Sequence, residues 1–129
     1  MTDKPQFTDD AVIFAYTRAD ALADGVLRDI SKLAQEAGIR YPTAMTAAAW
    51  AATVEPPADC PAQGIEGRAW DVLQLLLWQA KQKGPSDRFD YLVRVQESPA
   101  AWRDVALKAL VHPGDEGGPV VTIMLPHED

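Results

Sequence analysis

The stretch AWDVLQLLLWQAKQKGPSDRFDYLVRVQ, residues 69–96, decides the fold class. Its first part, Ala69–Lys83, carries apolar residues almost all round a helix, which is typical of a helix in the middle of a domain. Gly84 and Pro85 end that helix. From Phe89 onward apolar and polar residues alternate, which predicts a half-buried strand. A central helix followed by a strand predicts an α+β domain.

The chain after this stretch continues as β structure. Ser98–Arg103 reads as a connection that carries Trp102, either exposed or semi-buried. Residues 105–111 are apolar at every second position, which predicts the next strand. Turn residues fill 112–119, and Val120–Leu125 returns as a strand. The sequence therefore predicts a C-terminal β-hairpin with an acidic, glycine-rich tip.

The chain before the central helix alternates short elements. The wholly apolar run Ala11–Tyr16 predicts a buried strand. Thr17 and Asp20 form a capping-box pattern for a helical turn that Gly25 ends. The remaining expected elements are a strand at Val26–Ile30, a helix at Ser31–Ala37 with Ser31 as its N-cap and Gly38 as its stop, an alanine-rich helix at Thr43–Val54, and a loop at Glu55–Gly67.

These elements predict one domain. We expect a flexible N-terminus at 1–10 and a single α+β domain over 11–129. Its sheet should be small and mostly antiparallel, with about four to five strands packed on two to three helices. The chain has 129 residues, of which 47% are hydrophobic, so it can build its own core.

Composition excludes several classes of protein. Cys60 is the one cysteine, which excludes an intrachain disulfide and a cysteine-based zinc site. The net charge of −7, without a basic cluster, argues against direct nucleic-acid binding. The acidity serves solubility, or it imitates nucleic-acid phosphates for a basic partner. The start lacks a signal-peptide pattern and no apolar run could span a bilayer, so we expect a cytoplasmic protein without membrane contact.

The sequence contains no specific catalytic or metal-binding pattern. His112 and His127 stand outside any zinc-ligand spacing. Neither a Gly-x-Ser-x-Gly elbow nor a glycine-rich phosphate loop before a helix occurs. Asp115 and Glu116 could hold a hard cation, but their spacing fits no EF-hand loop and a solvated turn is the default interpretation. We expect no cofactor, no metal and no catalytic residues.

Several polar and aromatic residues remain as candidate contacts. The cluster after the first predicted strand could bind a ligand or could cap the helical turn. Arg68, beside Trp70, is a structural stacking residue or a contact for a partner. The full set of candidates is Tyr16, Arg18, Asp20, Asp24, Arg68, Trp102, Asp115 and Glu116.

Specific segments resemble a family of small bacterial proteins of unknown function. The matching segments are 12–21, 23–27, 36–42, 67–73 and 113–126. The resemblance runs from about residue 10 to the C-terminus and is weak at 55–64 and 96–104. Family members look like cargo of plasmids and integrated mobile elements. The resemblance implies mobile DNA in a bacterial host and supplies no activity.

Three hypotheses for function follow. The first is a non-enzymatic protein-interaction module that binds a host protein or complex, such as an anti-CRISPR or anti-restriction protein that occupies a basic nucleic-acid site. The second is a small enzyme or ligand-binding protein that uses Tyr16, Arg18 and Asp20. The third is a homodimer subunit with Trp102 or Trp50 at its interface.

Overall fold

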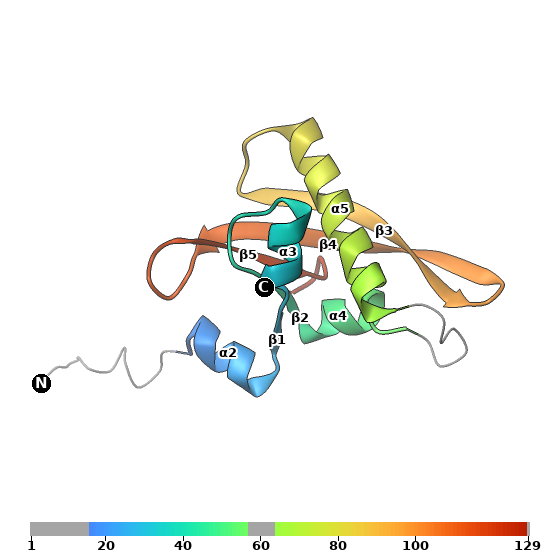
Figure 1. Ribbon diagram of the computed structural model, residues 1–129, viewed down its shortest axis with the longest axis horizontal. Coiled ribbons are helices and arrows are strands. Elements are labelled where there is room, and N and C mark those ends of the chain that lie inside the picture. Colours follow the sequence, from blue (N-terminus) through green and yellow to red (C-terminus); the bar gives the residue numbers. More distant parts are fainter. Residues whose placement is uncertain (1–15, 57–63, 129) are drawn as a thin grey trace, which may run out of the picture.

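A computed structural model describes residues 16–56 and 64–128. These residues form one mixed five-stranded sheet with helices packed around it (Figure 1). The elements are α2 (Arg18–Asp24), β1 (Leu27–Asp29), α3 (Ser31–Ala37), β2 (Thr43–Thr46), α4 (Ala47–Thr53), α5 (Ile65–Lys83), β3 (Arg88–Ser98), β4 (Ala101–Pro113) and β5 (Pro119–Met124). The predicted α+β class and the C-terminal hairpin, β4–β5, are confirmed. The predicted N-terminus at 1–10 and residues 11–15 of the first predicted strand lie outside the described residues.

The strands lie in the order β1-β2-β5-β4-β3. Among the described strands, β2 and β5 alone pair in parallel, so the expectation of a mostly antiparallel sheet is confirmed. The longest pairing joins β3 to β4 from Arg88 opposite Leu110 to Ser98 opposite Ala101. This order places β3, an eleven-residue strand, at one edge of the sheet.

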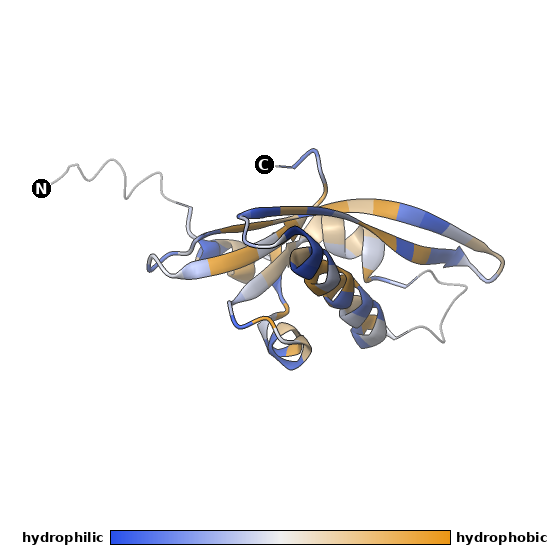
Figure 2. Ribbon diagram, turned by 90° about the horizontal axis from the view of Figure 1, so that it is seen from above, coloured by the Kyte–Doolittle hydropathy of each residue, from blue (hydrophilic) through white to orange (hydrophobic). Residues whose placement is uncertain are grey.

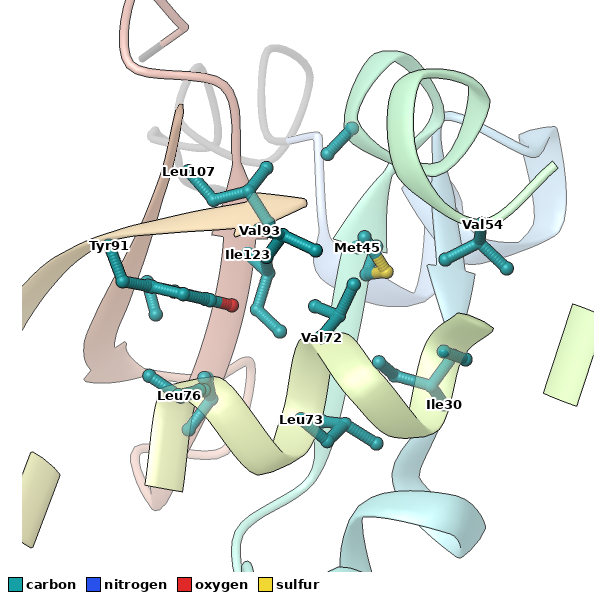
Figure 3. Packing of buried hydrophobic residues seen from close by; sticks show 14 of the residues in the cluster. Ile30, Met45, Val54, Val72, Leu73, Leu76, Tyr91, Val93, Leu107 and Ile123 are labelled. Carbon is teal, nitrogen blue, oxygen red and sulfur yellow. The ribbon is translucent and has the colours of Figure 1, made fainter. Parts of the chain in front are cut away.

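The core lies between the sheet and α3, α4 and α5. In α5, Val72 and Leu73 are completely buried. Figure 3 shows Val72 beside Ile123 of β5, and Leu76 beside Tyr91 of β3. The predicted alternation of β3 is confirmed, because all four of its inward residues, Phe89, Tyr91, Val93 and Val95, are buried. Period-two burial on a strand and an apolar stripe on a helix give this two-layer core.

The opposite face of the sheet is covered in part by the end of the chain. Lys108 and Thr46 alternate with core residues of their strands and so point to this face. The Thr46 hydroxyl donates to Glu128 Oε1 at 2.7 Å, and Lys108 Nζ donates to the Glu128 carbonyl. Figure 2 shows the C-terminal segment on this side and α5 on the other. Figure 2 also shows that the far half of the β3–β4 hairpin extends beyond this cover.

The expected helix ends are confirmed at two helices. Thr17 accepts from the backbone of Asp20, whose carboxylate accepts from the backbone of Thr17, so the capping box of α2 is present. Gly25, with φ +82°, ends α2 in the left-handed conformation. Gly38 ends α3 in the same way. Residues with a Cβ adopt this conformation at a cost, which glycine avoids.

Four expected boundaries are wrong. Thr43–Thr46 is strand β2, because pairing with β1 and β5 outweighs the helical preference of its neighbours, and Thr46 then caps α4 by accepting from Ala49 N–H. Ser31 is inside α3, since Ile30 occupies the cap position. The central helix starts at Ile65, four residues earlier than expected and inside the expected loop. Finally, a tight turn joins β3 to β4, so most of 98–103 is strand.

Candidate functional site

At the start of α2, the candidate residue Arg18 contacts the candidate residue Asp115 of the β4–β5 loop. The carboxylate of Asp115, in the β4–β5 loop, accepts from the backbone N–H of Arg18 at 2.8 Å and of Ala19 at 3.0 Å. These two donors hold the pKa of Asp115 below its ordinary value. A contact between residues almost a hundred positions apart thus anchors α2 on the C-terminal hairpin. Glu116, next to Asp115, is exposed to solvent.

The side chain of Arg18 reaches the sheet beneath α2. One guanidinium nitrogen donates to Thr122 Oγ1 at 2.6 Å, and the other donates to the Val121 carbonyl at 2.9 Å. Thr122 is buried, and its hydroxyl also lies 2.8 Å from Nε2 of His112. Burial lowers the pKa of Arg18, while the charges of Asp115 and Asp29 act in the opposite direction.

The other members of this group make local contacts. The Tyr16 hydroxyl donates to the Asp24 carboxylate at 2.8 Å, which raises the pKa of Tyr16. Asp20 belongs to the capping box. Capping therefore accounts for Asp20, whereas Arg18 is directed into the structure and does not cap the helix.

A hollow of about 700 Å³ adjoins these residues, and we name it the α2 hollow. Its polar wall includes Tyr16, Arg18, His112, Asp115 and Thr122. His112 was considered only as a zinc ligand at the level of sequence, and its role here was missed. The sequence feature that could have indicated this role is the position of His112 at the end of a predicted strand, three residues before Asp115. Pairing across the sheet then brings it opposite β5, beside Thr122.

Arg68 and Trp102 come together at a second hollow, of about 380 Å³, which we name the β3 groove. Its walls are the first half of α5, including Asp71, and residues 93–96 of β3. Arg68 is only 8% exposed, and its Nε donates to the Thr53 carbonyl at 3.0 Å. Trp102 is 55% exposed. Of these two candidates, Trp102 offers more of its side chain to a partner.

The backbone N–H and C=O groups of successive β3 residues point alternately toward β4 and away from it. Val111 N–H donates to the Asp87 carbonyl at 2.9 Å. In an antiparallel ladder, residues that bond the partner strand alternate with residues whose N–H and C=O point away from it. Tyr91 and Val93 follow Asp87 at even spacings, so their backbone groups also form hydrogen bonds with β4.

The backbone groups of Asp90, Leu92 and Arg94 point away from β4, and we call these groups the β3 edge. Arg88 has the same phase, and local side chains occupy its groups: Ser86 Oγ accepts from its N–H at 3.2 Å, and Lys83 Nζ donates to its carbonyl at 2.8 Å. Within 16–56 and 64–128, the structure gives the β3 edge no hydrogen-bond partner.

No group of three or more His, Cys, Asp or Glu side chains in the described part of the chain is arranged to hold a metal ion. Among the described helices, none has the length and apolar character needed to cross a membrane. Cys60 lies outside the described residues.

Comparison with known proteins places the chain in a family. The model of a family of unknown function, DUF6573, matches residues 4–129, so the chain belongs to that family. No curated protein and no solved structure matches the chain.

Proposed function

We propose that this member of a family of unknown function is a non-enzymatic protein-interaction module that binds a partner at the β3 edge. The observation that carries the proposal is the row of backbone donors and acceptors on Asp90, Leu92 and Arg94, for which the described residues supply no partner. An edge strand of this kind is a template for an added strand. The partner would supply an extended segment that becomes a sixth strand beside β3.

Side chains near the β3 edge suit such a partner. Leu92 is 60% exposed and alternates with the buried Tyr91 and Val93, so it lies on the face of the hairpin away from α5. Trp102, which is 55% exposed, lines the β3 groove. On the α5 side, the β3 groove runs beside residues 93–96. An added strand projects its side chains alternately to the two faces of the sheet. Those side chains would therefore contact Leu92 on one face and the β3 groove on the other. Exposed tryptophan is also common among residues that dominate binding energy.

We propose further that the partner is a bacterial host protein, in keeping with the resemblance to proteins of plasmids and mobile elements. The specific form is an anti-defence protein that blocks a CRISPR or restriction effector in the cytoplasm. The net charge of −7 supports binding to a basic surface. Mimicry of nucleic acid requires affinity that falls steeply with salt, because salt screens exposed charges beyond about 10 Å at 0.1 M.

The test is affinity capture from a bacterial lysate with three forms of the protein. Arg94→Pro removes one N–H of the β3 edge without removing a bond to β4, and proline is tolerated at strand edges. Arg94→Ala is the matched control, because it also loses the ion pair with Asp104 but keeps the N–H. We expect the wild type and Arg94→Ala to retain the same partner and Arg94→Pro to lose it, with circular dichroism confirming that each variant is folded.

The outcomes separate the alternatives. Equal capture by all three forms would contradict binding at the edge, and Trp102→Ser would then test binding at the β3 groove. Failure of the wild type to retain any partner would contradict the interaction module itself. Sedimentation as a dimer that Trp102→Ser dissociates would favour the homodimer subunit instead. Affinity that is equal at low and high salt would exclude the mimicry form alone.

A further inference from the structure

The guanidinium of Arg18 is a positive charge whose direct partners are neutral. Its nitrogens donate to the Thr122 hydroxyl and to the Val121 carbonyl. Among the residues that the structure describes, no carboxylate lies within ion-pair distance of it. The guanidinium is partly buried, and the charges of Asp115 and Asp29 act on it through space without a direct contact. Within 16–56 and 64–128, Arg18 therefore has no direct carboxylate partner at the wall of the α2 hollow.

The carboxylates around the same hollow accept hydrogen bonds from neutral donors. Asp115 accepts from two backbone N–H groups. Glu128 Oε1 accepts from the Thr46 hydroxyl at 2.7 Å and from Leu125 N–H at 2.8 Å. Asp24 accepts from the Tyr16 hydroxyl. The wall of the hollow therefore holds the Arg18 guanidinium beside carboxylates that already accept hydrogen bonds, and an added anion would pair with Arg18.

At the wall of the hollow, hydrogen bonds link Arg18, Thr122 and His112 in one direction. Nδ1 of His112 lies 3.1 Å from the Pro113 carbonyl, which can only accept, so Nδ1 carries the proton. In neutral His112, Nε2 then accepts from the Thr122 hydroxyl, whose oxygen accepts from Arg18. These hydrogen bonds hold the Arg18 side chain in position without neutralising its positive charge. The guanidinium is thereby held in place beside the hollow.

We infer that the α2 hollow binds a small organic anion whose carboxylate or phosphate oxygens pair with Arg18. A guanidinium suits both headgroups, because its fork of N–H donors can bond two oxygens together. The rest of the hollow is largely apolar, with Val26, Leu27, Leu110 and Met124 in its wall. Val26 is 50% exposed, so an apolar body attached to the anion would cover it. This site is separate from the β3 edge and independent of the proposed function.

The test is a nuclear magnetic resonance titration of the isotope-labelled full chain. Sodium phosphate and sodium hexanoate are each added at constant pH, against sodium chloride at equal ionic strength. We expect saturable shifts at the Arg18 Nε–H and at the Thr122 and His112 amides with at least one of the two anions. Saturation by hexanoate alone identifies a carboxylate with an apolar body, and saturation by phosphate alone identifies a phosphate headgroup.

Two variants distinguish a site from general screening. Arg18→Gln should weaken binding at least tenfold, because a charge-assisted contact is lost. Arg28→Gln removes one positive charge outside the hollow, where Arg28 stacks on Trp50, and should bind like the wild type. Equal weakening in both variants would overturn the inference. If Arg18→Gln fails to fold, the wild-type titration decides: shifts that do not saturate, or that match those of chloride, overturn the inference.

Discussion

Asp115 holds the first turn of α2 in place by accepting the backbone N–H of Arg18 at 2.8 Å. The contact joins a helix near the start of the chain to the loop of the C-terminal hairpin. Asp115 complements the helix start as an N-terminal acidic residue would, although it comes from a distant segment. We therefore expect Asp115→Asn to lower the melting temperature. The adjacent exposed Glu116 provides the control, since Glu116→Gln should have little effect.

The effect of Asp115 should depend on pH. Because its pKa is lower in the folded protein than the ordinary value of about 3.9, the carboxylate stabilises the fold at pH values above that ordinary value. This contribution is lost as the pH falls through the lowered pKa. The melting temperatures of the wild type and Asp115→Asn should therefore differ at pH 6 and converge at the acid end. A difference that persists unchanged to low pH would contradict the assigned contact.

The buried hydroxyl of Tyr91 predicts a substitution that does not destabilise. Tyr91 is 8% exposed, and its hydroxyl has no hydrogen-bond partner within the described residues. Burial also raises the pKa of this group strongly, so it remains protonated. Removing an unsatisfied buried donor relieves its desolvation cost. Tyr91→Phe should leave the free energy of unfolding unchanged or raise it by about 1 kcal/mol in urea denaturation.

Tyr41, which is 45% exposed, supplies the control for Tyr91. Tyr41→Phe should leave the free energy of unfolding within about 0.5 kcal/mol of the wild type. A loss of more than 1 kcal/mol in Tyr91→Phe alone would mean that the hydroxyl makes a stabilising hydrogen bond.

The two tryptophans proposed for a dimer interface should respond differently to substitution. Trp102 is 55% exposed, so Trp102→Ser should change the free energy of unfolding by no more than about 0.5 kcal/mol. Trp50 is partly buried against the core and stacks under Arg28 at 5.4 Å. Trp50→Ser should therefore cost about 2 kcal/mol or more. Chemical denaturation measures both, and equal costs would show that Trp102 is a packing residue.

The sequence predicted the parts of the fold that local patterns determine. Alternation in β3 and the glycine stops of α2 and α3 each depend on a few neighbouring residues, and the structure agrees with them. The strand at Thr43–Thr46 was missed because its pairing with β5 depends on residues far along the chain. The early start of α5 was missed because Gly64 and Gly67 favoured a loop.

The sequence predicted residues of the candidate site but not how they are arranged. The sequence indicates Arg18 and Asp115 separately, one in the polar cluster after the first predicted strand and the other in an acidic turn. Their contact depends on how the sheet places the β4–β5 loop beside α2, which no local pattern encodes. The partnership of His112 with Thr122 likewise follows from the β4–β5 register.

Amide hydrogen exchange should show the β3 edge directly. The N–H groups of Tyr91 and Val93 bond β4 and should exchange slowly, because they open only when the hairpin opens. Those of Leu92 and Arg94 point away from β4 and should exchange much faster, so protection alternates with a period of two. Residue-resolved exchange by nuclear magnetic resonance measures this pattern. Uniform protection along 90–94 would mean that another segment already covers the edge, whereas protection of Leu92 and Arg94 that appears only with a captured partner would be expected for strand addition.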